Sequence, residues 1–502
     1  MSLAALESRI AAVSDILCTL NLIVWDSRTM MPPGGTQARG HQIATLTRLA
    51  RDMLAADETV DLLGKAEEEA GTRPADDLAR EALRQIRHAV EVHRRVPAEL
   101  VERRAAVRAA ANAAWIEARA TDDFAHFAPW LEETVRNTRD YADALGWQGH
   151  PYDAMIGLYE PGETVASLQR LFAALRDGIA PILDAALGRS RPDTSFLTRD
   201  YPVDRQYEVA RRFSAAFGYD YARGRLDTTV HPFEISFTRG DVRITTRYRE
   251  RDIRPALFGA FHETGHGLYE QNVDDAFTRT VFATDLVGLY AVGGTSFGAH
   301  ESQSRLFENH VGRSLRFWQL HFAELQAAFP DALAGVTPEA FYAAVTDVRR
   351  SLVRTEADEL TYDLHIMLRV EFEAALMDGS LPVAEVPGAW REAMKRHLGL
   401  DVPNDREGCL QDIHWSSGMI GSFCTYTIGN VMGAQLHATA MRQEPAVRAG
   451  VEAGDYGPLG DWLRERVWRH GRSVSREEIL RRATGRGLDP ADYLAHLRVR
   501  YA

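Results

Sequence analysis

The sequence predicts a mainly α protein in which one helical body forms lobes around a groove. Apolar residues recur at helical spacing along most of the 502 residues, and only residues 231–248 show the alternation of β-strands. The sequence shows neither an internal repeat nor a linker that would free a domain. We therefore expect a single domain over 1–502, with an N-terminal helical lobe over about 1–220, a core over about 221–435 and C-terminal helices over about 436–502.

Helical patterns alternate with breaks in the N-terminal lobe. Residues 1–24 are amphipathic, and the next stretch, Trp25–Gly35, contains two prolines and two glycines that are expected to end the helix. Proline-containing loops are expected over 146–162 and 188–204. The expected helices are 1–24, about 36–55, several within 57–146, 164–187 and about 204–217.

A strand signal lies directly before the most distinctive helix. Apolar residues alternate over 233–237 and 242–244 around a glycine-containing turn, which predicts a β-hairpin. An edge strand here can pair with an extended peptide, although a purely structural hairpin has the same pattern. The helices expected after it cover about 257–270, about 298–329, two segments within 338–378 and the polar tail 446–502.

Composition excludes several kinds of partner. The net charge is −13 and there is no long basic run, so nucleic acid and anionic membranes are not expected to bind. Cys18, Cys409 and Cys424 form no disulfide framework, which favours a cytoplasmic protein. The first residues lack a signal-peptide layout, and no stretch reaches the roughly 18 uninterrupted apolar residues of a membrane helix.

The motif His262-Glu263-Thr-Gly-His266 carries the strongest chemical signal. Helical positions i and i+4 lie on one face, so both imidazoles can bind one metal ion, and Glu263 can take the proton of a metal-bound water. This is the arrangement of zinc hydrolases. The apolar flanks predict a buried helix, where two imidazoles and a carboxylate need partners. A helix whose histidines face water or a packed neighbour is the alternative.

A third ligand is expected to be a carboxylate. Glu270 lies two helical turns beyond His262, which is far for sharing one ion, and Asp274 and Asp275 lie in a predicted loop. Glu301 opens the next long helix, a rigid element that can hold a ligand in place. We therefore favour Glu301.

Six motifs, in order along nearly the whole chain, resemble those of a known family. They are His231-Pro-Phe, Asp241-Val-Arg-Ile-Thr, His262-Glu-Thr-Gly-His, His300-Glu-Ser-Gln, Val353-Arg-Thr-Glu-Ala-Asp and Gly408-Cys-Leu-Gln-Asp-Ile-His-Trp. Together with Trp25-Asp and Met31-Pro-Pro-Gly-Gly, they resemble the motif set of the M32 metallocarboxypeptidases, the thermostable carboxypeptidase Taq family.

The resemblance implies a two-lobed, mostly helical zinc peptidase with a deep central groove and a small hairpin beside the metal helix. It implies a homodimer that removes single C-terminal residues from peptides with broad specificity. His262, His266 and Glu301 would bind Zn²⁺, with Co²⁺ or another divalent metal as an alternative, and Glu263 would be the general base. Two other functions stay open: an endo-acting metallo-oligopeptidase and a metal-free peptide-binding scaffold.

The resemblance also implies five substrate-binding residues. Arg354 would hold the terminal carboxylate, His231 and His414 would lie near the scissile carbonyl, Tyr426 would assist the oxyanion and Gln411 would line the pocket. Each has a structural alternative, because Arg354 has acidic neighbours that can pair with it and the two histidines and Tyr426 can be core residues.

Two departures from the family pattern bear on substrate preference. The segment 271–297 looks longer than usual, and Ser422 and Cys424 stand where tyrosine and proline are expected. Both changes are expected to alter the substrate pocket rather than the metal chemistry.

Overall fold

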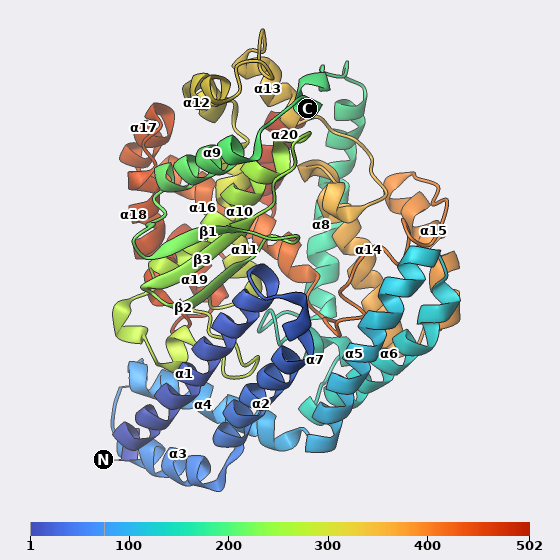
Figure 1. The fold of residues 1–502 in the computed structure, drawn as a ribbon. Helices are drawn as coiled ribbons and strands as arrows, with labels where there is room; N and C mark the ends of the chain where they lie inside the picture. The colour runs from blue at the N-terminus through green and yellow to red at the C-terminus, as the bar shows by residue number, and fades with distance from the viewer. Residues whose placement is uncertain (1, 75) are drawn as a thin grey trace. The chain divides into compact units, whose positions relative to one another are not determined.

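The structure is a computed structural model that describes residues 2–74 and 76–502 (Figure 1). Helices dominate the described chain, and its one sheet has three strands. The prediction of a mainly α fold with a small sheet is therefore confirmed.

The chain forms two compact units, each assembled from separate stretches. Unit 1 comprises the chain up to His93, Pro192–Val345 and Gly429–Asp489. Unit 2 comprises Arg94–Arg191, Thr346–Ile428 and Pro490–Ala502. The units interleave along the chain, whereas the expected lobes were contiguous; the limits near residues 220 and 435 stay a prediction.

Unit 1 combines helices with the sheet. Its strands are β1 (Gly224–Thr228), β2 (Glu234–Thr238) and β3 (Asp241–Thr246). Its helices are α1 (Ser2–Thr29), α2 (Thr36–Ala55), α3 (Asp57–Ala70), most of α4 (Leu78–Arg95), α9 (Val203–Ala216), α10 (Arg254–Gln271), α11 (Phe297–Arg305), α12 (Leu315–Ala328), α13 (Pro338–Val345), the greater part of α16 (Cys424–Gln443), α17 (Pro445–Ala453), α18 (Gly457–Arg466) and α19 (Arg476–Thr484).

The sheet has the order β1-β3-β2 and packs against α10 (Figure 1). Antiparallel pairing of β2 with β3 confirms the predicted hairpin. Strand β1 pairs with β3 in parallel and was not predicted. Its sequence, Gly-Arg-Leu-Asp-Thr, contains one apolar residue and so shows no alternation; pairing with a distant segment makes it a strand.

Helix α1 extends beyond the predicted end at residue 24. It continues to Thr29, three residues before Pro32, so the expected break at Trp25 is wrong. The Trp25 side chain is buried, with the Arg243 guanidinium 4.3 Å from its ring centroid. Tertiary packing of this side chain therefore extends the helix up to the proline pair.

Helix α1 is also long and apolar enough, by length and composition alone, to cross a membrane. The helix lies at the N-terminus, and a core helix of a globular protein meets the same criteria. Leu6, Val13 and Leu17 on α1 are fully buried in a core that unit 1 provides. The finding is therefore weak evidence for a membrane segment.

The single long helix expected over 298–329 is wrong. It is divided into α11, a π-helical segment η5 (Leu306–Gly312) and α12. Ser314 separates the last two, because its side chain accepts the N–H of Phe317 as an N-cap. π-Helical turns are rare and often occur at functional sites, and η5 directly follows the helix that carries Glu301.

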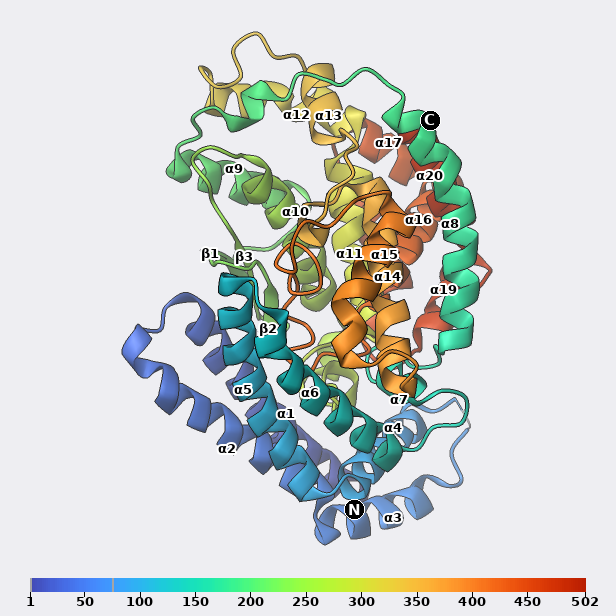
Figure 2. The same ribbon diagram turned by 90° about the vertical axis from the view of Figure 1, so that its right-hand side faces the viewer.

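Unit 2 is helical. Its helices are α5 (Ala98–Thr121), α6 (Phe124–Leu145), α7 (Pro151–Ile156), α8 (Val165–Leu187), α14 (Glu359–Asp378), α15 (Val386–Leu398) and α20 (Ala491–Tyr501). Helices α5 and α6 lie side by side (Figure 2). Helix α7 lies in a predicted loop, where Pro151 at its first position and the His150 cap start one short helix.

Glu373 on α14 makes the stability of the protein depend on pH. Burial raises the pKa of this carboxyl to about 7, although Tyr152, Gly421 and Trp415 donate hydrogen bonds to it. The folded state therefore binds this proton more tightly than the unfolded state, so stability falls as the pH rises from about 4.5 to about 7. We expect a loss of about 3 kcal/mol from this group.

Urea denaturation of wild type and Glu373→Gln at pH 5 and pH 8 measures this effect. The variant cannot ionise, so wild type should lose stability relative to it between the two pH values. A stability difference that is the same at both pH values would contradict the expectation.

Candidate metal centre

Helix α10 carries the motif between an aromatic core and a polar face. Phe261 is fully buried, with its ring centroid 5.0 Å from that of Phe217 and 5.5 Å from that of Phe317. Since this apolar contact fixes the rotation of α10, the opposite side presents His262 and His266. The predicted burial of the helix is confirmed.

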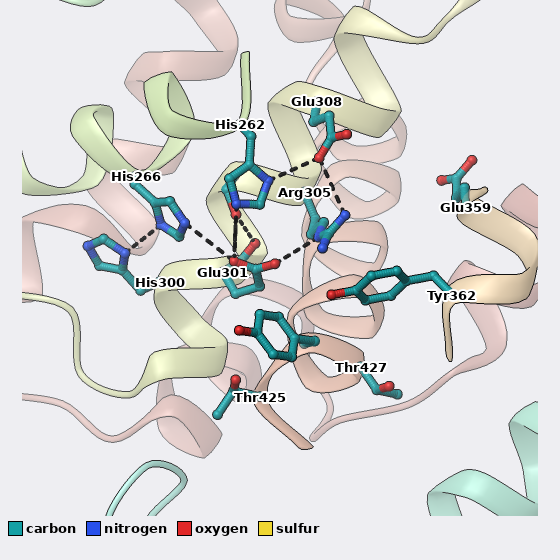
Figure 3. Close-up of polar contacts among 12 residues, drawn as sticks. His262, His266, His300, Glu301, Arg305, Glu308, Glu359, Tyr362, Thr425 and Thr427 are labelled. Atoms are coloured by element: carbon teal, nitrogen blue, oxygen red, sulfur yellow. Dashed lines mark hydrogen bonds and ion pairs between the residues drawn. The ribbon is translucent and has the colours of Figure 1, made fainter. Parts of the chain in front are cut away.

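His262, His266 and Glu301 form a group of potential metal ligands. One donor atom from each lies within 4.8 Å of the others. The Nε2 atoms of His262 and His266 lie 3.5 and 3.3 Å from Glu301 Oε2. Figure 3 shows the three side chains converging from α10 and α11. Two imidazoles and one carboxylate are a common donor set for a divalent metal with an open position.

Glu270 lies outside this group, as its spacing suggested. It is fully buried, and its oxygens accept the backbone N–H groups of Gly293 and Gly294 and pair with Arg239 at 2.9 Å. Burial alone would raise the pKa of Glu270, but Arg239 and the hydrogen bonds hold it well below its usual range. Its carboxylate is therefore occupied by the protein.

Glycines let α10, α11 and α16 approach closely enough to form the donor group. A Cβ on Gly265 would overlap the carbonyl oxygen of Gln303 and lie 2.6 Å from Ser304 Cα. A Cβ on Gly429 of α16 would lie 2.5 Å from Glu301 Cγ. Only glycine permits such contacts without moving the backbone.

The electrostatics of the group favour a bound cation. Burial lowers the pKa of His262, but the carboxylates of Glu301 and Glu308 outweigh it and raise the pKa to about 10. Burial and the neighbouring His300 lower the pKa of His266 to about 3. His262 therefore carries a positive charge beside two carboxylates, and the donor atoms here fit a divalent metal that would replace this charge.

Glu263 lies next to the first donor on the buried part of α10. It is 5% exposed, and burial raises the pKa of its carboxyl to about 7 even though the His262 charge opposes this. A carboxylate with a pKa near neutrality can both accept and return a proton.

Unit 2 contains a cluster around Arg354. Arg354 donates from Nε and Nη2 to Asp412 Oδ1 at 3.1 and 2.8 Å, and from Nη1 to the Tyr362 hydroxyl at 2.8 Å. Arg369 donates to the same carboxylate at 2.5 Å. Arg354 thus forms an ion pair, as in its structural alternative, but with Asp412 rather than with its acidic neighbours in the sequence.

Three other expected substrate residues belong to the same cluster. Gln411 Oε1 accepts the Arg354 backbone N–H at 2.8 Å, and its Nε2 donates to Leu352 O. The Nε2 atom of His414 lies 3.3 Å from the Tyr426 hydroxyl. Burial and the Arg354 charge lower the pKa of His414 to about 3, so its imidazole is neutral at physiological pH.

His231, the fifth expected substrate residue, does not belong to this cluster. His231 precedes β2 in unit 1 and is exposed, so it is not a core histidine. Ser422 and Cys424 are buried in unit 2. In the segment 271–297, Val281, Phe282 and Leu286 pack in the core that contains α1.

Several residues around the centre had no role predicted from the sequence. Glu308 accepts a hydrogen bond from His262 Nδ1 at 3.0 Å, and Arg305 Nε donates one to Glu301 at 2.8 Å (Figure 3). Arg305 and Glu308 follow Glu301 at positions i+4 and i+7, a helical spacing that could have indicated them. No local spacing could have indicated Arg369 as a second partner of Asp412.

A mainly helical fold with this donor set and an adjacent glutamate defines a metallopeptidase of the His-Glu-x-x-His class. Residues 5–501 match the family described as carboxypeptidase Taq (M32) metallopeptidase. The chain belongs to this family of metallocarboxypeptidases, as its motifs indicated.

Relatives and solved structures agree with this membership. The chain is 38% identical to thermostable carboxypeptidase 1 of Thermus thermophilus, with 96% of this chain and 94% of the relative covered. It is 36% identical to carboxypeptidase 1 of Bacillus subtilis, with the same coverage. Its fold matches the crystal structure of an M32 carboxypeptidase from Deinococcus radiodurans with a TM-score of 0.94 and 39% identity, covering 100% of this chain and 98% of that one.

Proposed function

We propose that this protein is a zinc-dependent carboxypeptidase that removes single C-terminal residues from peptides with broad specificity. The observation that carries the proposal is the donor group of His262, His266 and Glu301 with Glu263 beside it on α10. A divalent metal held by these three residues would polarise the scissile carbonyl and lower the pKa of a water molecule to near 7.

Glu263 would serve as the general base and then as a general acid. Its carboxylate takes the proton from the attacking water and passes it to the leaving amine. Burial of Glu263 excludes the bulk water that would otherwise compete for this proton.

The Arg354 cluster would bind the terminal carboxylate of the substrate. Arg354, Arg369 and Asp412 together carry two positive charges and one negative charge, which leaves a net charge of +1 in a buried place. The guanidinium of Arg354 has five N–H groups, and the hydrogen bonds to Asp412 and Tyr362 leave one on each terminal nitrogen. These two groups can bind a carboxylate in the bidentate manner.

The other residues of the cluster would support this binding. Gln411 holds the backbone of Arg354 through its amide, and we therefore expect it to position the arginine. The Tyr426 hydroxyl, beside the neutral His414, would donate to the oxyanion of the scissile carbonyl. We propose that His231, on the exposed segment before β2, contacts the same part of the peptide.

Metal identity, compartment and assembly belong to the same proposal. Zinc suits two imidazoles and a carboxylate, and cobalt or another divalent metal is the alternative. The three free cysteines favour the cytoplasm. The family resemblance favours a homodimer.

Hydrolysis of an N-blocked dipeptide with a free C-terminus, compared with its C-terminal amide, tests the proposal. We expect kcat/KM for the amide to be about 10²-fold lower, because it cannot form the charge-assisted bonds to Arg354. In Arg354→Gln, hydrolysis of the free acid should fall by about the same factor while that of the amide changes little.

Arg350→Gln is the matched control, since Arg350 is an exposed arginine on the same segment. It should leave both rates unchanged. Equal rates for acid and amide in wild type would instead identify an endo-acting oligopeptidase. Equal slowing of both substrates by Arg354→Gln would show that Arg354 acts only through the fold.

A further inference from the structure

His266 contacts a second imidazole on the side opposite the donor group. Its Nδ1 lies 2.5 Å from Nδ1 of His300, and the two rings stack with centroids 4.5 Å apart. His300 Nε2 in turn lies 3.1 Å from Glu270 Oε1. Figure 3 shows His266 between His300 and Glu301. The proposed mechanism does not use this chain of contacts.

Glu270 determines the proton position at its end of this chain. Its other partners are all hydrogen-bond donors, so the carboxylate oxygens only accept. His300 Nε2 must therefore carry a hydrogen and donate it. The donors besides His300 are the N–H groups of Gly293 and Gly294 and the Ser236 hydroxyl, and the guanidinium of Arg239 forms an ion pair with the carboxylate.

With one hydrogen on Nε2, the His300 ring can accept a hydrogen bond at Nδ1. A divalent metal on His266 Nε2 would require that nitrogen to carry no hydrogen, so the hydrogen of the His266 ring would lie on Nδ1. His300 Nδ1, which is 2.5 Å away, is in place to accept it. His266 Nε2 faces Glu301.

We propose that His300 is a positioning residue that relays the acceptor character of Glu270 to His266, so that His266 presents an unprotonated Nε2 to the metal. This inference rests on the proposed function. The other imidazole ligand, His262, is held directly, because Glu308 Oε2 lies 3.0 Å from its Nδ1. With a metal bound, each imidazole ligand would be held in one tautomer, one by a carboxylate and the other through a second imidazole.

The surrounding backbone is shaped for this relay. A Cβ on Gly294 would lie 2.5 Å from His300 Cδ2, so a side chain there would displace the ring. On its other face, the His300 ring stacks on Tyr269 with centroids 5.5 Å apart and an angle of 16°. The ring is therefore held in one orientation between its two hydrogen bonds.

Two variants of equal shape separate the relay from packing. In His300→Asn, Oδ1 takes the place of Nδ1 and can accept the hydrogen of His266, whereas His300→Leu has the same outline without an acceptor. Both lose the ring and the donor to Glu270. We expect leucine to weaken Zn²⁺ binding about 10–100-fold and asparagine to stay within a few-fold of wild type. Competition with a chromophoric chelator measures the dissociation constant.

Controls separate failure of the relay from failure of the metal site. His262→Ala must abolish binding, and His321→Leu, which removes a histidine outside the donor group in unit 1, must leave it unchanged. If both His300 variants bind equally well or equally poorly, the relay is overturned while the metal site stands. If His262→Ala binds zinc like wild type, both proposals are overturned.

A second measurement does not require the leucine variant to fold. In ¹⁵N-histidine-labelled, zinc-loaded wild type, the resonances that His300→Asn removes should be those of an imidazole with its hydrogen on Nε2 and a bare Nδ1. Resonances of a ring protonated at Nδ1 would overturn the proposal.

Discussion

Glu263→Gln is expected to reduce kcat about 10²–10⁴-fold while the protein retains its metal. Glutamine has the shape of glutamate but cannot take a proton from water or return one to the leaving amine. Glu263 does not belong to the donor group, so the metal ligands keep their places. Hydrolysis of an N-blocked dipeptide, with metal content determined on the same samples, measures both effects.

Glu301→Gln is the matched control because it makes the same chemical change on a proposed ligand. It should lose metal and activity together, whereas Glu263→Gln should lose activity alone. A Glu263→Gln variant that holds metal and turns over at the wild-type rate would remove Glu263 from the mechanism. A wild-type protein without bound metal would contradict the metal centre itself.

Gly265→Ala is expected to have the largest effect on the fold around the centre. The added methyl group would overlap the carbonyl oxygen of Gln303 and lie 2.6 Å from Ser304 Cα, both on the helix that carries Glu301. Backbone atoms cannot move aside as a flexible side chain can, so α10 and α11 must separate. We expect a loss of about 1–3 kcal/mol and a lower metal affinity, measured by urea denaturation and chelator competition.

Gly64→Ala serves as the control for this change. Gly64 lies inside α3, and beyond the adjoining residues and the backbone of its own helix no atom lies within 4 Å of an added Cβ. Alanine there should stabilise the protein by up to about 1 kcal/mol, because it favours the helix more than glycine does. The account of the α10–α11 contact would be wrong if both substitutions had the same effect.

Features that depend on neighbours within a turn or two could be predicted from the sequence alone. Helical periodicity predicted most helices, and alternation predicted the β2–β3 hairpin. The i, i+4 spacing of His262 and His266 places two imidazoles on one face of any helix, whatever surrounds it. Glu301 could be preferred over Glu270 because a distance of two turns along a helix is also a local property.

Which distant groups meet depends on tertiary packing. Strand β1 exists because it pairs with β3, and α1 extends to Thr29 because Trp25 is buried. His300 reaches His266 across 34 positions in sequence, and Arg354 reaches Asp412 across 58. A hydrogen bond between such residues leaves no periodic trace in the sequence, because folding, rather than local spacing, brings the partners together.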